Sequence, residues 1–344
     1  MKKQKKCLIW DLDNTLWDGI LAEGGEVCLK DGIQEVLSEL DKRGILLSIA
    51  SKNDHDEAMA KLKDFGIEEF FLYPQISWST KADSIAAIAK ALNIAVDALA
   101  FVDDQAFERE EILYHHGDVM VIDAADYREI PQMEAFTPRF ITEDSKLRRE
   151  MYRSDLNRKA SEEVFHGSSE EFLATLQMEL TIAPVAYGDL ERVEELTVRT
   201  NQLNSTGVTY SFEKLEGYIN SPDHVFLVAS LTDKFGTYGK IGIVLLEETA
   251  EELKIKLLLM SCRVMTRGIG SALLVHIIKL AQAKGKKLTA DFIHTGKNRV
   301  MYVTYKLMGF AEENPEDEEA QRCNLVYNGQ DHVDYPAYLK LTVS

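Results

Sequence analysis

The sequence predicts an α/β protein with two domains, a doubly wound parallel-sheet domain followed by a mixed α/β domain. Its 344 residues suffice for two domains at roughly 150 residues each. Over residues 1–125, short and continuously apolar runs alternate with segments of helical periodicity. This alternation is typical of a parallel sheet covered by helices on both faces. From about residue 178, runs of strands with interspersed helices indicate a separate mixed domain.

Five apolar runs predict the strands of the first domain, at 7–10, 45–50, 70–73, 99–102 and 119–122. Between them, two groups of apolar residues recur at helical spacing: Ile33, Val36, Leu37 and Leu40, and then Ile85, Ile88, Ala89 and Leu92. Ligands of doubly wound sheets bind at the carboxyl ends of the strands. The acidic and hydroxyl residues of this domain lie at those predicted ends.

Residues 138–177 are charged and helical in pattern, with no strand signal, so we expect a helical connector there. The predicted domains are therefore 1–137 and 178–344. In the second domain, strands are expected at 225–231, 241–246, 253–260 and 288–293. Helices are expected after the glycines near 268–270 and from about residue 298, and the acidic stretch 312–319 is expected to be a solvated loop.

Charge and cysteine content exclude several functional classes. With 39 basic and 57 acidic residues, the net charge of −18 argues against binding to duplex nucleic acid or to an anionic membrane. The four cysteines form no C-x-x-C pair, so neither a disulfide framework nor a structural zinc site is expected. No apolar run is long enough for a membrane span or a signal peptide, which predicts a cytoplasmic protein.

Polar residues with complementary chemistry follow the predicted strands. A lone D-x-D pair is as often a turn or a helix cap as a site, but here three further features follow it in order. The set comprises Asp11 and Asp13 after the first strand, Ser51 after the second, Lys81 at a helix start, and Asp103 and Asp104 after the strand 99–102. Phosphoryl transfer needs such a carboxylate nucleophile, phosphate-binding groups and acidic ligands for a hard cation. Magnesium prefers oxygen ligands of this kind.

These positions resemble the four motifs of the haloacid dehalogenase (HAD) phosphohydrolase superfamily, with D-L-D-N-T-L as the first motif. The resemblance implies that Asp11 is the nucleophile and that Asp13 is the general acid/base. It implies that Ser51 and Lys81 hold the phosphate. It also implies a Mg²⁺ site made by Asp11, Asp103 and the backbone carbonyl of Asp13, with assistance from Asp104.

Longer segments are similar to the FkbH-like proteins of polyketide pathways. They are K-C-L-I-W-D-L-D-N-T-L-W, A-S-K-N-D-H-D, F-V-D-D-Q-A-F-E-R-E and R-T-N-Q-L-N-S-T-G. This resemblance covers nearly the whole chain. It implies that a glyceryl unit is taken from 1,3-bisphosphoglycerate, dephosphorylated and loaded onto an acyl carrier protein for methoxymalonyl-type extender units, with Asn53 as a substrate contact. Two alternatives stay open: a phosphatase of a small metabolite with an accessory second domain, and a binding module, against which the intact motif set argues.

The second domain carries a glycine loop before a predicted helix. A glycine loop like that of Arg267, Gly268 and Gly270 can cradle a pyrophosphate at a helix N-terminus, and a short Gly-x-Gly is equally found in a simple tight turn. Together with Asn298 and the sequence Y-V-T-Y-K-L-M-G-F at 302–310, they resemble the GNAT-type N-acetyltransferase fold. That family has Arg or Gln three residues before the first glycine, where this chain has Met265. The resemblance therefore implies recognition of the phosphopantetheine arm of a carrier protein rather than of acetyl-CoA.

Transfer to a carrier thiol is either direct or through an enzyme thioester. Some FkbH-like proteins have a cysteine just before the serine of the second motif, where this chain has Ala50. Cys262, which precedes the glycine loop, is the remaining candidate thiol. Free cysteines are most often small buried apolar residues, so direct transfer is favoured. Cys7 is expected in the core and Cys28 in a β-flap after the first motif.

Overall fold

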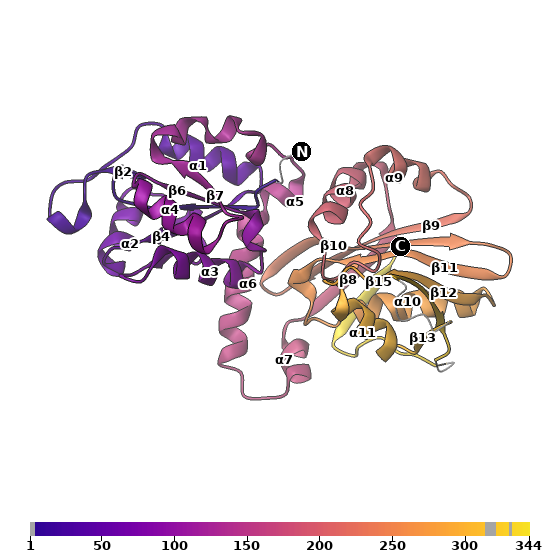
Figure 1. Ribbon diagram of the computed structural model, residues 1–344. Coiled ribbons are helices and arrows are strands. Elements are labelled where there is room, and N and C mark those ends of the chain that lie inside the picture. The colour runs from indigo at the N-terminus through magenta and orange to yellow at the C-terminus, as the bar shows by residue number, and fades with distance from the viewer. Residues whose placement is uncertain (1–3, 314–320, 330–331) are drawn as a thin grey trace. The chain divides into compact units, whose positions relative to one another are not determined.

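The two predicted parts of the chain are both present, each with its own sheet (Figure 1). The computed structural model describes residues 4–313, 321–329 and 332–344. The chain divides into two compact units, Met1–Leu156 and Asn157–Ser344. This division falls inside helix α6 (Arg148–Glu163) and so inside the segment 138–177 expected as a connector. That segment also contains α5 (Glu143–Lys146) and α7 (Ser169–Thr175).

The first unit contains a parallel sheet with the strand order β5-β4-β1-β6-β7. Its strands are β1 (Cys7–Trp10), β4 (Leu46–Ser51), β5 (Gln75–Ile76), β6 (Leu99–Asp103) and β7 (Met120–Asp123). Its other helices are α1 (Ile33–Lys42), α2 (His55–Asp64), α3 (Lys81–Leu92) and α4 (Ala106–His115). A short hairpin of β2 (Trp17–Asp18) and β3 (Cys28–Leu29) forms the expected flap.

Both faces of this sheet are buried at its central strands β1, β4 and β6, which explains why these strands are mostly apolar and do not alternate apolar and polar residues. Along β1, Leu8 and Trp10 join the core that contains residues of α1 and α2. Cys7 and Ile9 point to the other face and join the core that contains residues of α3 and α4. The alternation of side chains along a strand produces this division. The doubly wound parallel domain predicted from the sequence is confirmed.

The predicted strand at 70–73 is wrong. Residues Glu68–Phe70 form a 3₁₀ turn, and Phe71 makes only an isolated bridge to Leu47. Tyr73 then adopts a φ of 51°, a left-handed conformation that interrupts an extended strand. Regular pairing begins two residues later, at β5. Periodicity alone cannot distinguish a short buried strand from another buried segment, so the apolar run 70–73 is not sufficient evidence for a strand.

The second unit contains a mixed sheet with the order β13-β14-β12-β11-β10-β9-β8-β15. Its strands are β8 (Met178–Pro184), β9 (His224–Asp233), β10 (Gly236–Glu248), β11 (Glu252–Met260), β12 (Lys287–Ile293), β13 (Phe310–Glu312), β14 (Arg322–Tyr327) and β15 (Leu339–Val343). Its further helices are α8 (Leu190–Arg199), α9 (Phe212–Ile219), α10 (Ile269–Ala283) and α11 (Arg299–Leu307). The pairs β11–β12 and β8–β15 are parallel and the others antiparallel, so the mixed α/β fold is confirmed.

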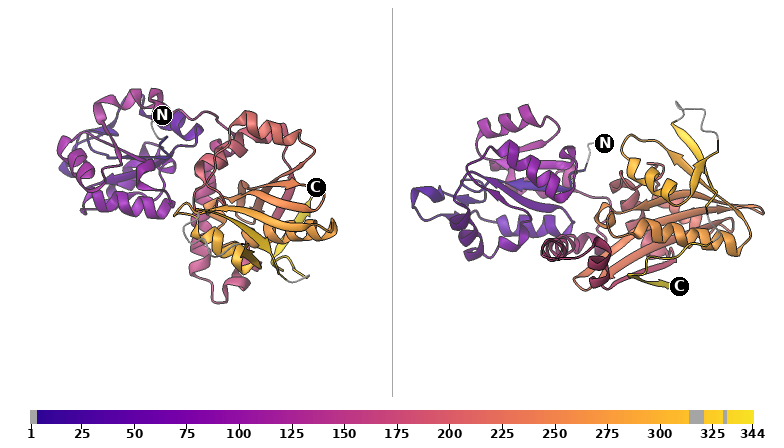
Figure 2. Two further views of the ribbon diagram at one scale, coloured as in Figure 1. Left: turned by 45° about the vertical axis from the view of Figure 1, so that its right-hand side comes forward. Right: turned by 90° about the horizontal axis from the view of Figure 1, so that it is seen from below.

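Helices cover both faces of the second sheet (Figure 2). Along β10, Ile243 and Leu245 pack in the core that contains α8 and α9, whereas Val244 and Leu246 pack in the core that contains α7, α10 and α11. Of the acidic stretch 312–319, Glu312 ends β13, and residues 314–319 lie outside the described residues. Within the described part of the chain, no helix combines the length and apolarity needed to cross a bilayer.

A buried ion pair anchors the start of the second unit. Arg158 is fully buried, and its guanidinium donates to both carboxylate oxygens of Asp233, at 2.7 and 2.8 Å. The same guanidinium lies 3.8 Å from the ring centroid of Tyr238. Burial alone would raise the pKa of Asp233, but its hydrogen bonds and ion pair with Arg158 outweigh burial and lower it. The ion pair therefore stabilises the second unit above the unfolded-state pKa of about 3.9, and this contribution is lost as the pH falls through the lower folded-state value.

Replacing Arg158 by Met is expected to destabilise the second unit by about 3 kcal/mol at neutral pH, because it leaves the buried Asp233 carboxylate without its cation. Hydrogen–deuterium exchange of β9 and β10 measures the loss locally. The matched control is Lys340→Met, since Lys340 is 70% exposed and pairs with Glu179 at the surface. That control should cost less than about 1 kcal/mol. If β9 and β10 lost the same protection from hydrogen–deuterium exchange in both variants, the Arg158–Asp233 ion pair would not be what stabilises the second unit.

Candidate active site

The predicted phosphate-site residues of the first unit meet at one edge of its sheet. Asp11 follows β1, Ser51 ends β4 and Asp103 ends β6, and these three strands are neighbours. Lys81 is the first residue of α3, whose N-cap Thr80 accepts a hydrogen bond from the Asp83 amide. These four side chains, of Asp11, Ser51, Lys81 and Asp103, are all buried. The carboxyl ends of adjacent parallel strands thus bring distant sequence positions together, as expected for this fold class.

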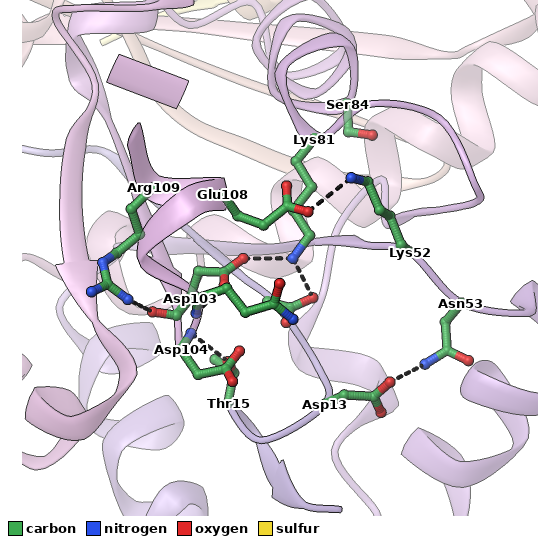
Figure 3. Close-up of polar contacts among 12 residues, drawn as sticks. Asp13, Thr15, Lys52, Asn53, Lys81, Ser84, Asp103, Asp104, Glu108 and Arg109 are labelled. Carbon is green, nitrogen blue, oxygen red and sulfur yellow. Dashed lines mark hydrogen bonds and ion pairs between the residues drawn. The ribbon is translucent and has the colours of Figure 1, made fainter. Parts of the chain in front are cut away.

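Lys81 lies between two carboxylates (Figure 3). Its Nζ lies 3.1 Å from Asp11 Oδ1 and donates to Asp103 Oδ2 at 2.5 Å. Burial raises the pKa of Asp11 to about 6 and raises that of Asp103, although the nearby ammonium opposes both shifts. Burial acts to lower the pKa of Lys81, but the two negative charges outweigh it and raise that pKa. Lys81 is therefore a fixed positive charge at the position where phosphate oxygens are expected.

Three carboxylates form a group with the geometry of a hard-cation site. Oxygens of Asp11, Asp103 and Asp104 lie within 4.8 Å of one another. Asp104 Oδ1 is buried and has no hydrogen-bond partner among the residues that the structure describes. A buried carboxylate oxygen without a donor is costly unless a ligand completes it. An all-oxygen donor set of this kind fits Mg²⁺, which keeps several waters and takes one or two carboxylates from the protein.

Asp13 is oriented by three donors. Its Oδ1 accepts from Trp17 Nε1 at 2.8 Å and from the Leu21 amide at 3.1 Å. Its Oδ2 accepts from Asn53 Nδ2 at 3.0 Å, a contact seen in Figure 3. Asn53, expected from the resemblance to contact substrate, thus holds the carboxylate of Asp13. The roles of Asp13 in proton transfer and, through its carbonyl, in metal binding stay predictions.

Four residues at this site have no role predicted from the sequence: Thr15, Lys52, Glu108 and Arg109. The Asp104 amide donates to Thr15 Oγ1 at 3.2 Å, and Arg109 Nη1 donates to the Asp103 carbonyl at 2.7 Å. Lys52, next to Ser51, forms a 2.8 Å ion pair with Glu108, which is nearly buried. Glu108 lies in the first turn of α4, and nothing in its spacing along the chain identifies Lys52 as its partner.

In the second unit, the glycine loop is held by close packing. Gly268 has a φ of 73°, a left-handed conformation that favours glycine, and a Cβ there would come 2.1 Å from Tyr338 Oη, so the Tyr338 side chain would have to move. Arg267 lies over the ring of Phe172 and forms a 3.4 Å ion pair with Glu162. The first-turn amides of α10, including that of Gly270, have no intrahelical partner by the geometry of any helix. Because Arg267 is paired with Glu162, these amides are the groups left to bind an anion at the predicted site for the phosphopantetheine arm.

The strands β11 and β12 pair only over Glu252–Ile255 and Lys287–Ala290. Beyond that point, the chain's own segment 203–205 lies between them. The Met260 amide donates to the Leu203 carbonyl at 2.8 Å, and the Ser205 amide donates to the Leu258 carbonyl at 2.9 Å. The Ile293 amide of β12 donates to the Ser205 carbonyl at 3.0 Å. Residues 203–205 of the R-T-N-Q-L-N-S-T-G segment therefore lie between the two parallel strands.

Asn298, expected to contact the carrier arm, is used by the fold itself. Its Nδ2 donates to the carbonyls of Asn204 and Ile293, at 3.0 and 2.8 Å, and its Oδ1 accepts from the Thr295 amide at 3.1 Å. The side chain is buried, so its amide fixes the segment 203–205 rather than facing a ligand. Cys262 is half-buried in the 3₁₀ turn Cys262–Val264, immediately after β11. Its predicted role as a thioester carrier is untested by this placement.

Comparison with known proteins identifies a family for part of the first unit. The family model for haloacid dehalogenase-like hydrolases matches residues 20–110, which include Ser51, Lys81, Asp103 and Asp104. No curated protein matches the chain.

Three solved structures illustrate the similarity. The N-terminal part of the Bacteroides fragilis protein BF1531, containing a phosphatase domain complexed with Mg, is 31% identical with a TM-score of 0.36; the alignment covers 40% of this chain and 42% of that one. The Escherichia coli ribosomal-protein-S18-alanine N-acetyltransferase is 14% identical with a TM-score of 0.34, covering 45% and 99%. The Thermoplasma acidophilum PaiA N-acetyltransferase in complex with coenzyme A is 21% identical with a TM-score of 0.35, covering 43% and 98%.

The family match and the site agree on one part of the chain. The match spans the strand ends and the helix start that supply the hydroxyl, the ammonium and two of the three clustered carboxylates. The first unit of this chain therefore contains a haloacid dehalogenase-like hydrolase domain.

Proposed function

We propose that the chain is a magnesium-dependent phosphohydrolase that passes a glyceryl unit from 1,3-bisphosphoglycerate to the thiol of an acyl carrier protein. The observation that carries the phosphohydrolase part is the buried Lys81 between Asp11 and Asp103, beside a third carboxylate. The glyceryl and carrier-protein part is supported by the resemblance of four long segments to FkbH-like proteins.

In this reaction Asp11 attacks phosphorus, and the bond from phosphorus to the leaving oxygen breaks. Asp13, held by Trp17 and Asn53, donates the proton that the leaving oxygen takes up. Water then attacks the phosphorus of the aspartyl phosphate and gives its proton to Asp13. The bond from phosphorus to the Asp11 oxygen breaks, which regenerates the carboxylate and releases inorganic phosphate. Lys81 and Ser51 bind the phosphate oxygens throughout. A Mg²⁺ ion held by Asp11, Asp103 and Asp104 would supply charge neutralisation on the phosphoryl group.

Loading requires a second bond change. The carrier thiol forms a C–S bond to the acyl carbon of 1,3-bisphosphoglycerate, and the bond from that carbon to the phosphate oxygen breaks. The thiol proton goes to solvent and the 1-phosphate leaves, while the 3-phosphate is removed through Asp11. Because the enzyme carries a net charge of −18, long-range attraction to an acidic carrier is absent. Docking therefore depends on the phosphopantetheine arm and a local surface.

One observation favours the second candidate, a phosphatase of a small metabolite with an accessory second unit. The gap between β11 and β12 is filled by residues 203–205, and Asn298 is bound to that segment. A phosphatase needs no acyl acceptor, so a second unit without an arm site is compatible with it.

Intact-mass spectrometry of the carrier protein distinguishes the two candidates. With 1,3-bisphosphoglycerate and Mg²⁺, a holo carrier protein should gain a glyceryl-sized mass, and the apo form, which lacks the arm, should gain none. Cys262→Ala should slow loading without abolishing it if transfer is direct, and abolish it if an enzyme thioester is obligatory. Phosphate release with no adduct on any holo carrier would leave only the phosphatase.

Chelation tests the metal. Exhaustive EDTA treatment is expected to abolish phosphate release, and added Mg²⁺ to restore it, because the clustered carboxylates repel an incoming phosphate unless a cation neutralises them. The measurement is released phosphate before and after dialysis into excess Mg²⁺. Full activity in EDTA would rule out the metal site.

A further inference from the structure

Three metal-binding side chains meet at the end of the second unit's sheet, outside the site described above. His294 directly follows β12, Cys323 lies on β14 and Glu312 ends β13. A ring nitrogen, the sulfur and a carboxylate oxygen of these residues all lie within 4.8 Å of one another. The sulfur of Cys323 is 3.9 Å from His294 Nε2. His294 is exposed and the other two side chains are partly buried, so solvent ions can reach the group.

The strand register explains why these three side chains lie close together. Cys323 is paired with Phe292 on β12, and Leu325, two residues further along β14, is paired with Glu312 on β13. Directly paired residues and residues two apart on a strand share one face of a sheet. His294 comes two residues after Phe292, and its amide donates to the Gln321 carbonyl at 2.7 Å. Three consecutive sheet neighbours therefore present nitrogen, sulfur and oxygen donors on the same side.

The separation of these donors suits a tetrahedral ion. Bonds of about 2.3 Å to sulfur and about 2.1 Å to nitrogen, at a tetrahedral angle, place the two atoms about 3.6 Å apart. The observed 3.9 Å needs only a small side-chain adjustment. A mixed set of thiolate, imidazole and carboxylate selects Zn²⁺, whereas the all-oxygen group of the first unit suits Mg²⁺.

We propose that His294, Glu312 and Cys323 bind a Zn²⁺ ion, with water as the fourth ligand. Three protein ligands and an open position are the pattern of zinc sites that bind water or substrate. On binding, the Cys323 S–H bond is replaced by an S–Zn bond and the proton goes to solvent.

Neighbouring side chains hold the ligands in position. Tyr302 of α11 donates a hydrogen bond to Glu312 Oε1. The His294 ring packs against the rings of Phe292 and Tyr302, with centroids 5.0 and 5.2 Å apart. Such partners orient metal ligands and contribute to affinity. Without a metal, burial and the Glu312 charge raise the pKa of Cys323 to about 11, so the thiol stays protonated at neutral pH.

Cobalt substitution of the full-length protein tests the site without reference to activity. Reduced protein titrated with Co²⁺ should show a near-ultraviolet thiolate-to-cobalt charge-transfer band that saturates at one ion per chain and disappears when Zn²⁺ is added. The carboxylate group of the first unit contains no sulfur, so it cannot produce this band. Absence of the band in the wild-type protein would overturn the proposal.

Variants identify the ligands. Cys323→Ser should remove the band, and His294→Gln and Glu312→Gln should each weaken Co²⁺ binding about tenfold or more, with Tyr302→Phe weakening it less. The matched controls are Cys28→Ser and Cys262→Ser, which remove the exposed and the other half-buried thiol and should leave the band unchanged. A band that survives Cys323→Ser, or that is lost in either control, would assign the metal elsewhere. Circular dichroism confirms that each variant is folded.

Discussion

Replacing Asp11 by Asn is expected to lower the rate of phosphate release by a factor on the order of 10⁴ or more, while the first unit remains folded. A neutral amide cannot attack phosphorus, so the aspartyl phosphate does not form. The measurement is phosphate released from p-nitrophenyl phosphate or 1,3-bisphosphoglycerate in the presence of Mg²⁺. Asp31→Asn is the matched control, because the Asp31 side chain is 94% exposed on the same unit and should leave the rate unchanged.

The same variant has an expected signature in the folding of metal-free protein. Burial raises the pKa of Asp11 to about 6, above its unfolded-state value of about 3.9. A carboxyl with a raised pKa contributes stability below the unfolded value and loses it as the pH rises through the folded value. In EDTA at pH 7, Asp11→Asn should therefore be at least as stable as the wild type. Phosphate release near the wild-type rate would reject Asp11 as nucleophile, and an unfolded variant would show a structural requirement instead.

Replacing Lys81 by Met is expected to destabilise the metal-free first unit by about 3–5 kcal/mol and to remove phosphate release. The ammonium is the cation between two buried carboxylates, at 3.1 Å from Asp11 and 2.5 Å from Asp103. Without it, the two buried carboxyls must either carry charge with no cation beside them or take up protons, and both cost folding free energy. All three tryptophans lie in the first unit, at positions 10, 17 and 78, so tryptophan fluorescence, excited where tyrosine does not absorb, reports on this unit alone during urea unfolding.

Magnesium should partly restore the stability of Lys81→Met, and raise its denaturation midpoint more than that of the wild type, because the ion supplies positive charge at the same carboxylates. Lys90→Met on the exposed side of the same helix is the control and should cost under about 1 kcal/mol. If Lys81→Met unfolded at the wild-type urea concentration in EDTA, the two carboxylates would not depend on Lys81 for their charge balance.

The strands of the first unit, and the polar residues at their ends, could be predicted from the sequence because the central strands are buried on both faces. Continuous apolar runs such as 7–10 and 99–102 are typical of strands buried on both faces, and the polar residues after such strands are expected at the sheet edge. The exception, 70–73, shows the limit of this reasoning. Its residues are as apolar as a strand, but Tyr73 takes a left-handed conformation that only the surrounding chain decides.

The tertiary structure decided what each polar group contacts. Asn53 binds Asp13, Asn298 binds the segment 203–205, and Glu108 pairs with Lys52, none of which follows from spacing along the chain. Absence of C-x-x-C pairs had argued against a structural zinc site, yet strand pairing brings Cys323 beside His294 from 29 residues away. Sequence periodicity encodes which face of an element is apolar and where strands end, so it predicted the fold class and the polar residues that meet at the strand ends. Register and side-chain packing depend on contacts between distant segments, so only the folded chain determined the partners of those residues.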